Sequence, residues 1–239
     1  MALQVWLPLN GNLNNQGLSN VTVTNNGATI DDNGKIGKCY SFDGSNDFIL
    51  CSQNFLSNST KEWSYACWMK PNISHNGCLF SCRNSTNVTG ITIFYYNSRW
   101  LIDSGSRWTL DPKIIISPNN WYHVCVTRGN HNLSLYINGI LDSSISFNSN
   151  LTNVCNTYFT IGNSQSAPTT TTGNPFNGRI NDVRIYDHCL SPKEVKEISK
   201  GLVLHYKLDD NSIGITIPRN GGLIPDGIEL YDYIESNGT

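Results

Sequence analysis

The sequence has few charged residues and no excess of basic ones. Asp, Glu, Lys and Arg make up 14% of its 239 residues, and the formal net charge is −2. Soluble domains usually contain about 25% of these four residue types. Because the chain has no basic field that would attract phosphate groups, its composition argues against a nucleic-acid partner and against binding to an anionic membrane surface.

Long apolar runs are also missing. No run approaches the roughly 20 apolar residues that a membrane-spanning helix needs, so we expect no membrane insertion. Residues 1–6 lack the basic segment and the apolar segment of a secretory signal peptide. We therefore expect synthesis in the cytoplasm, with release by lysis or a holin-type exit if the protein works outside the cell.

The sequence lacks the signatures of a hydrolase active site. No G-x-S-x-G elbow is present to expose a nucleophilic serine. Glu229, Asp232 and Glu235 are spaced by three residues, so on a strand Asp232 would face away from the other two. Retaining glycosidases need two carboxyl groups about 5–5.5 Å apart. The sequence therefore does not predict an enzyme, and we expect His123 to be a packed residue of a strand rather than a base.

The eight cysteines leave two interpretations open. With no sign of an oxidising compartment, all eight can be reduced, small apolar residues of the interior. Alternatively, Cys39 and Cys51 flank a turn at residues 43–47 and could face each other across a hairpin, which would allow a disulfide. Cys78 and Cys82 have C-x3-C spacing, but no second pair completes a zinc site.

Short apolar or alternating runs, separated by turn residues, recur along the chain and predict antiparallel strands. In the run 63–69, every second residue from Trp63 onward lies on one face. Asn138-Gly139 predicts a type I′ hairpin turn. We expect residues 38–42 and 48–51 to pair as a hairpin, and further strands at residues 5–9, 78–81, 91–96, 100–103, 121–127, 133–137, 159–162 and 179–186.

One helix is predicted, at residues 192–199. Ser191 is placed to cap it, Pro192 occupies the first helical position, and Glu194 completes a capping box. Gly201 is placed to end it.

A second pattern begins after this helix. Residues 202–208 repeat the alternation of residues 3–9, and a Gly- and Pro-rich stretch follows. We therefore divide the chain into a sandwich domain at residues 1–200 and a linker with the truncated start of a second domain at residues 201–239. A lone strand cannot satisfy its own backbone groups, so we expect the run 202–208 to dock on the sandwich or to fray.

Three segments, in this order, carry a family resemblance. They are residues 40–44 (YSFDG) with 47–49 (DFI), residues 121–124 (WYHV) with 135–139 (LYING), and residues 176–186 (FNGRINDVRIY) with 190–195 (LSPKEV). They resemble the F-D-G-x-x-D-Y-V, W-x-H-V … L-Y-x-D/N-G and F-x-G-x-I-D-D-V-R-I-Y segments of LamG-like jelly rolls. The chain thus looks like a pentraxin-like member of the concanavalin A-like lectin/glucanase superfamily.

The resemblance implies an all-β fold, namely a two-sheet antiparallel jelly-roll sandwich of the concanavalin A-like type with one short C-terminal helix. Several such domains hold calcium. By the same resemblance, Asn10 and Asn12 in the first turn and Asp182 in the last strand would hold one structural Ca²⁺. The acidic calcium loop of the pentraxins is matched by residues 163–166, which contain no carboxylate, so that site is not carried over.

Such domains also often bind glycans through loops at the rim of the sandwich, and one segment of the chain suits this role. Sugars use an aromatic ring for their C–H face and planar polar groups for their hydroxyls. The polar stretch 164–174 could form a second wall of the rim. The candidate ligand-binding residues are Arg99, Trp100, Asp103, Arg107 and Trp108. For Trp100 and Trp108 the alternative is a place in the core, as we expect for Trp6, Trp63, Trp68 and Trp121.

Together these features predict a non-catalytic carbohydrate-binding or cell-surface adhesion module. Residues 229–239 (ELYDYIESNGT) resemble a segment of phage tail and prophage proteins of gut Firmicutes, which implies a phage tail or receptor-binding protein. The expected partners are a glycan or cell-surface polysaccharide and other virion or surface protein domains, on the virion or on the bacterial surface after release. The alternative is a structural spacer or decoration domain without a ligand.

Overall fold

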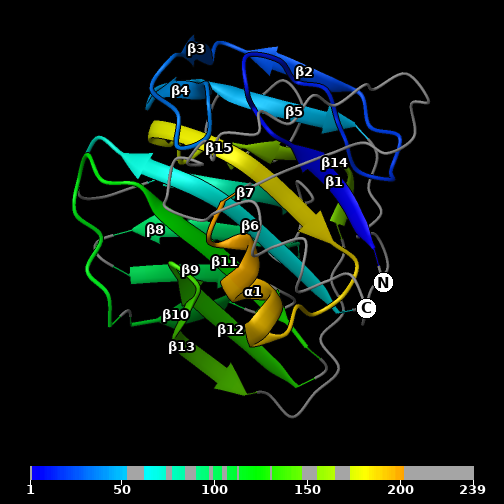
Figure 1. Cartoon of the computed structure of the whole chain (residues 1–239), viewed down its shortest axis with the longest axis vertical. Helices are drawn as coiled ribbons and strands as arrows, with labels where there is room; N and C mark the ends of the chain where they lie inside the picture. Colours follow the sequence, from blue (N-terminus) through cyan, green and yellow to red (C-terminus); the bar gives the residue numbers. More distant parts are fainter. Residues whose placement is uncertain are drawn as a thin grey trace, which may run out of the picture. The chain divides into compact units, whose positions relative to one another are not determined.

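Two antiparallel sheets pack face to face, with one helix on the outside of the sandwich (Figure 1). The computed structural model describes residues 2–52, 62–73, 77–83, 90–96, 99–103, 107–111, 113–129, 131–146, 155–164 and 173–201. At positions 83, 96, 103, 107–109 and 155–157 it describes the backbone alone. The predicted fold class is confirmed.

The first sheet has eight strands. Its strand order is β13 (Ile140–Ser146), β12 (Asn132–Ile137), β11 (Tyr122–Arg128), β6 (Trp63–Pro71), β15 (Asn177–Tyr186), β4 (Cys39–Asp43) and β3 (Thr29–Asp31), and β1 (Leu3–Leu7) also pairs with β15. Strand β15 therefore has three partners: β6 along one edge, and β4 and β1 in succession along the other.

The second sheet has seven strands. Its order is β10 (Arg107–Leu110), β9 (Arg99–Asp103), β8 (Thr92–Tyr96), β7 (Gly77–Arg83), β14 (Cys155–Ile161), β5 (Phe48–Ser52) and β2 (Val23–Asn26). The hairpin β9–β10 forms one end of this sheet, and β10 is its edge strand.

The main core lies between the sheets. Because side chains alternate along a strand, every second residue of β6 from Trp63 to Met69 points into it, as the sequence predicts. Trp100 and Phe159 enter the same core from the seven-stranded sheet. Burying one large apolar side chain contributes about 1.5–3 kcal/mol relative to leaving it exposed, so this layer is the main source of stability.

The predicted hairpin of residues 38–42 and 48–51 is wrong, because β4 belongs to one sheet and β5 to the other. The chain crosses between the layers in the turn that follows β4. Gly44 has a φ of 82° there, and the carboxylate of Asp47 accepts the N–H of Asp43 at 2.8 Å. Both strands face the same core from opposite sides, so their alternation alone looks like that of a hairpin.

Because β4 and β5 belong to different sheets, Cys39 and Cys51 do not face each other across a hairpin, and the predicted disulfide between them is absent. Cys39 and Cys51 are buried free thiols, and burial raises the pKa of Cys39 to about 11. The expectation that all eight cysteines are reduced is nevertheless wrong, because Cys82 in β7 is disulfide-bonded. The pairing of β7 with β14, which no sequence pattern predicts, places Cys155 opposite Arg83 in the register.

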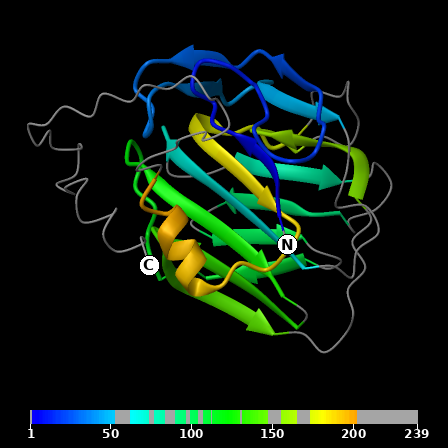
Figure 2. The ribbon, with the colours of Figure 1, turned by 45° about the vertical axis from the view of Figure 1, so that its right-hand side comes forward.

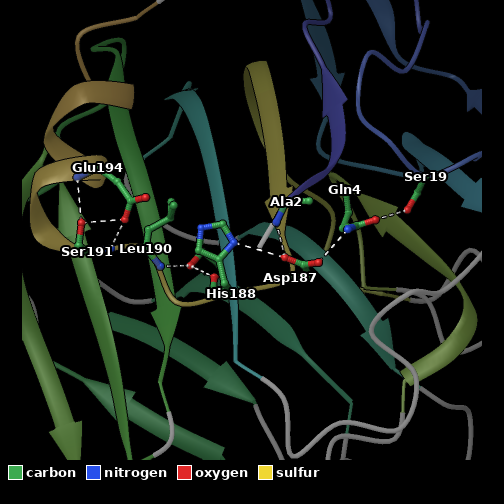
Figure 3. Close-up of polar contacts among 9 residues, drawn as sticks. Ala2, Gln4, Ser19, Asp187, His188, Leu190, Ser191 and Glu194 are labelled. Atoms are coloured by element: carbon green, nitrogen blue, oxygen red, sulfur yellow. Dashed lines mark hydrogen bonds and ion pairs between the residues drawn. The ribbon is translucent and has the colours of Figure 1, made fainter.

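Helix α1 (Pro192–Ile198) covers part of the outward face of the eight-stranded sheet (Figure 2). Val195 and Leu190 pack there against Ala66, Cys125 and Tyr136. The predicted capping box is present: Ser191 Oγ accepts the N–H of Glu194, and the Glu194 carboxylate accepts the N–H of Ser191 at 2.7 Å (Figure 3). Gly201 follows with a φ of 83°.

The segment between β15 and α1 is fixed by hydrogen bonds at both ends (Figure 3). The carboxylate of Asp187 accepts the backbone N–H of Ala2 at 2.6 Å and the side-chain amide of Gln4 at 2.9 Å. Ser64 Oγ donates to the carbonyl of His188 and accepts the N–H of Leu190. These bonds hold the start of the helix on the sheet.

The strands β2, β3 and β10 were not predicted. β2 (VTNN) and β3 (TID) are short, polar and at or near a sheet edge, so they have little apolar alternation to detect.

The type I′ turn is confirmed, because Asn138 and Gly139 both have positive φ, at 52° and 77°. Trp121 differs from the prediction of a core residue: it is only half-buried, just before β11.

No helix in the described ranges is long and apolar enough to cross a bilayer. The predicted strand at residues 202–208 and the rest of the segment 201–239 beyond Gly201 lie outside the described residues. The division of the chain at residue 200 stays a prediction.

Candidate functional site

The five residues predicted to bind a glycan lie on the hairpin β9–β10, and its register separates them. Trp100 is fully buried in the core, where its ring lies 5.1 Å from that of Tyr95. It cannot stack on a ligand, so its assignment to the binding site is wrong. Residue 108 lies opposite Ile102, a core residue, and residues directly opposite each other in an antiparallel pair share a face. The side chain of Trp108 lies outside what the structure describes.

Arg99 and residues 103 and 107 occupy the other set of positions, which faces away from the core. Asp103 lies opposite Arg107 in the register. Arg99 forms an ion pair with Asp111 at 3.0 Å, with side chains 61% and 75% exposed. An exposed pair of this kind contributes only about 0–1 kcal/mol to stability, so both groups are available to a ligand at little cost.

A row of hydroxyl groups continues from these positions across the outward face of the seven-stranded sheet. Asp103 lies opposite Thr92, Thr92 opposite Ser81, and Ser81 opposite Thr160. We call Thr92, Ser81 and Thr160 the hydroxyl row. The oxygens of Ser81 and Thr92 are 3.4 Å apart, and all three residues are buried. From β10 to β14 the register crosses four inter-strand steps, or about 19 Å.

Asn163 lies beside the end of this row, in the turn after β14. Its backbone carbonyl accepts the hydroxyl of Thr160 at 2.6 Å. The Asn163 side chain is fully buried, yet within the described structure neither its Oδ1 nor its Nδ2 has a hydrogen-bond partner. Gly173 lies directly against it, because a Cβ at position 173 would collide with Oδ1. No local sequence pattern marks Asn163, because residues 163–166 match the pentraxin calcium loop only in position and contain no carboxylate.

On the outward face of the eight-stranded sheet, the polar groups around Asp182 bind one another, although Trp68 Nε1 and His123 Nδ1 on the same face have no hydrogen-bond partner within the described structure. Asp182 Oδ1 accepts the indole N–H of Trp6 at 2.7 Å, and the guanidinium of Arg184 binds both carboxylate oxygens. The same guanidinium lies 5.1 Å from the Trp6 ring centre. This cluster fills the space around the last strand with contacts inside the protein.

The predicted calcium ligands do not fit a calcium site in this arrangement. Asp182 already neutralises Arg184, and the side-chain oxygens of Asn10 and Asn12 accept the backbone N–H groups of Lys38 and Asn14. Calcium needs six to eight oxygen ligands that are free to bind it. Calcium binding stays a prediction, without assigned ligands.

The link between the first turn and the last strand is made instead by Asn181. Its amide donates to the carbonyls of Pro8 and Lys38 at 2.8 and 2.9 Å, and its Oδ1 accepts the N–H of Ile36 at 2.8 Å. Pro8 follows β1 and Lys38 precedes β4, so Asn181 joins the two strands that share one edge of β15. The family resemblance pointed instead to the neighbouring Asp182, as a calcium ligand.

His123 and Trp68 lie on the same outward face, beneath Lys35. The two rings meet edge to face at 5.3 Å, and Lys35 Nζ lies 4.8 Å from the centre of the Trp68 ring. Burial, assisted by the charge of Arg184, lowers the pKa of His123 to about 3. His123 is therefore neutral at pH 7 and is a packed strand residue, as predicted.

The two-layer antiparallel sandwich, with a helix on one sheet and a row of hydroxyls on the other, is a concanavalin A-like domain. The chain belongs to the Laminin_G_3 family of the concanavalin A-like lectin/glucanases superfamily, whose model matches residues 43–196. No curated protein sequence matches the chain.

Solved structures share this fold at low sequence identity. Domain 4 of AbnA, an extracellular GH43 arabinanase of Geobacillus stearothermophilus, was solved with arabinotriose; it is 21% identical, with a TM-score of 0.64 over 83% of this chain and 98% of that domain. The ligand-binding domain of botulinum neurotoxin serotype D, solved with N-acetylneuraminic acid, is 18% identical, with a TM-score of 0.63 over 85% of this chain. The binding domain of Paraclostridial Mosquitocidal Protein 1 is 18% identical, with a TM-score of 0.65 over 83% of this chain. The chain spans 52% of each of the two toxin domains.

Proposed function

We propose that this domain is a non-catalytic carbohydrate-binding module whose site lies on the outward face of the seven-stranded sheet. The observation that carries the proposal is the continuous line of polar positions from Asp103 and Arg107 through the hydroxyl row. Hydroxyl groups both donate and accept hydrogen bonds, as sugar hydroxyls do. A line of about 19 Å suits an extended ligand such as an oligosaccharide.

The exposed ion pair of Arg99 and Asp111 lies on the same hairpin β9–β10, at the opposite end of β9 from Asp103, and is open to a ligand. A guanidinium and a carboxylate offer donors and acceptors side by side for sugar hydroxyls. The other sheet offers less, because α1 and the cluster around Asp182 already occupy its outward face.

The solved structures with this fold also support a carbohydrate-binding role. The arabinanase domain, which was solved with arabinotriose, is matched over nearly its whole length. The neurotoxin domain was solved with N-acetylneuraminic acid, but the chain covers only about half of it. The arabinanase domain is therefore the better guide to a module of this size.

Two buried carboxylates, Asp142 and Asp182, support a binding role without catalysis. Asp142 is buried and accepts the backbone N–H groups of Lys113 and Ile114, while Asp182 binds Trp6 and Arg184. Carboxylates engaged in this way stabilise the fold and are not poised as an acid and a nucleophile. No group of three or more His, Cys, Asp or Glu that could hold a metal occurs among the described residues.

The biological setting predicted from residues 229–239, a phage or prophage tail protein that acts on the virion or the bacterial surface, is part of the proposal. Those residues lie outside the described part of the chain. A cell-surface polysaccharide would suit such a setting as ligand.

The test is glycan binding by the full chain on an array, compared with the variant Arg99→Ala/Asp111→Ala. We expect wild-type binding and a loss of about tenfold in the variant, with an unchanged thermal midpoint, because the pair is exposed. The matched control is Asp32→Ala/Lys38→Ala, an ion pair at 2.8 Å with side chains 80% and 53% exposed, which should bind like wild type.

Two results would contradict the proposal. If the wild-type chain binds no glycan, with or without calcium, the domain is a spacer or decoration module. If the Arg99/Asp111 variant and the control bind equally, the glycan site is elsewhere on the molecule.

A further inference from the structure

Two buried asparagines differ in whether their side-chain amides form hydrogen bonds. Asn163 and Asn181 are both fully buried. The Asn181 amide makes three hydrogen bonds to backbone groups, at 2.8 to 2.9 Å. The Asn163 amide makes none within the described structure. A buried polar group without a partner destabilises a fold. Among the described residues, Trp68 and His123 each leave one buried nitrogen unpaired, whereas Asn163 leaves both polar atoms of its side chain unpaired.

The residues around Asn163 limit what could form hydrogen bonds with its amide. Thr160 donates to its backbone carbonyl, so Asn163 lies next to the hydroxyl row. Its side chain points at Gly173, and Asn174 beside it is held by Ser164 Oγ, which accepts the N–H of residue 174 at 3.1 Å. Asn174 in turn accepts the N–H of Cys78 at the start of β7. The backbone is thus fixed around an amide that is left unpaired.

The chemistry of these neighbours sets the class of ligand. Thr160, Ser164 and Gly173 are uncharged, so the surroundings offer nothing to neutralise an anion. A cation such as calcium would require carboxylate or several carbonyl oxygens beside the single Oδ1. An amide presents one acceptor and two donor hydrogens in one plane, which suits two adjacent hydroxyl groups.

We propose that Asn163 is a specificity-determining residue of the carbohydrate site, and that its amide binds adjacent hydroxyls of a neutral sugar. This inference rests on the proposed function and deepens it. It places a neutral glycan, rather than an acidic one such as a sialylated glycan, at the β14 end of the hydroxyl row. Because Asn163 has no exposed surface in this structure, a sugar reaches its amide only by displacing the groups that cover it, and binding then supplies the hydrogen bonds that the free domain lacks.

The experiment compares Asn163→Leu with Asn181→Leu in the full chain. Leucine has the same number of side-chain heavy atoms as asparagine and the same branching at Cγ, but it is somewhat larger and has no polar atoms. We expect Asn163→Leu to raise the thermal midpoint by about 2–4 °C, because it removes an unpaired buried amide. We expect it to weaken binding of neutral oligosaccharides by about tenfold or more. Asn181→Leu should lower the midpoint, because three backbone groups lose their partner.

Binding is measured on a panel of neutral oligosaccharides that includes arabinotriose, and on an acidic panel that includes N-acetylneuraminic acid. If Asn163→Leu lowers the midpoint and leaves neutral binding intact, the amide is satisfied by an internal water and the inference is wrong. Intact binding with a raised midpoint also overturns it, while the proposed function stands.

Two further outcomes separate the inference from the proposed function. If the wild-type chain binds only the acidic panel, the neutral class is wrong and the carbohydrate module stands. If it binds neither panel, both proposals fall. Should Asn163→Leu not fold, Asn163→Ala removes the amide without adding bulk, and it must lose neutral binding to the same extent.

Discussion

The outward faces of the two sheets differ in the polar groups that they leave available. On the eight-stranded sheet, Asp182 binds Arg184 and Trp6, Asn181 binds three backbone groups, and α1 covers apolar side chains, although Trp68 Nε1 and His123 Nδ1 have no partner in the described structure. On the seven-stranded sheet, both polar atoms of the buried Asn163 side chain lack a partner in the described structure, and Arg99 and Asp111 form an exposed ion pair. Under the proposed function, the first face stabilises the domain and the second offers polar groups to a ligand.

The largest expected effect is on the covered face, at Arg184. Arg184→Met would leave the buried carboxylate of Asp182 without its cation. Removing one partner of a buried ion pair costs about 3–5 kcal/mol, so chemical denaturation should show a loss of that size. The double variant Asp182→Asn/Arg184→Met should recover part of it, because no charge is left unpaired. An equal loss in both variants would show that the charge is not the cause.

The next effect depends on pH and comes from His123. Its folded-state pKa of about 3 lies below the usual value of 6.5, so between these values the unfolded state binds more protons. Stability from this group is therefore complete above about pH 6.5 and declines as the pH falls toward 3, by about 1.4 kcal/mol per pH unit. His123→Phe keeps a ring against Trp68 and should flatten this decline in denaturation curves from pH 7 to pH 4.5. Parallel curves for the two proteins would contradict the assignment.

A smaller effect is expected at the helix that covers the same face. Ser191→Ala removes the side chain that accepts the N–H of Glu194, and the loss of such a cap costs about 0.5–2 kcal/mol. Ser191→Thr retains a capping hydroxyl and serves as the control. If the two variants are equally stable, packing of Val195 and Leu190 alone holds the helix on the sheet.

The smallest effect is expected on the seven-stranded sheet, at the hydroxyl row. Thr92→Val keeps the shape of the side chain and removes one oxygen, which lies 3.4 Å from Ser81 Oγ. A contact that long is weak, so the free energy of unfolding should change by less than about 1 kcal/mol. Glycan binding should fall in the same variant. A stability loss as large as that of Arg184→Met would make the row structural and remove the contrast between the two faces.

The sequence predicted the elements whose signals are local. The alternation of β6, the turn at Asn138-Gly139 and the capping box of α1 each depend on neighbouring residues. The sequence-based predictions were wrong where the outcome depends on which strands pair in the folded structure. Alternation cannot tell that β4 and β5 enter opposite sheets, nor that Trp100 faces the core within a polar segment.

The candidate site was less predictable, for a physical reason. Clustering in sequence brought Arg99, Trp100 and Trp108 together, but strand geometry sends successive residues to opposite faces. The hydroxyl row consists of residues from β8, β7 and β14, which only strand pairing makes neighbours. The unpaired state of Asn163 depends on what surrounds it in space, and no local motif records that.

The position of β15 has a consequence for the order of events during synthesis. This strand, the last of the described strands along the chain, lies between β6 and β4 and also pairs with β1. Until residues 177–186 emerge, the strands of the eight-stranded sheet form three parts, namely β13–β12–β11–β6, β4–β3 and β1, whose facing edges carry unpaired backbone groups. Contacts between residues as distant as Leu3 and Tyr186 make folding slow and expose those edges to other chains. The facing edges of the nascent sheet therefore stay unpaired until β15 has been synthesised.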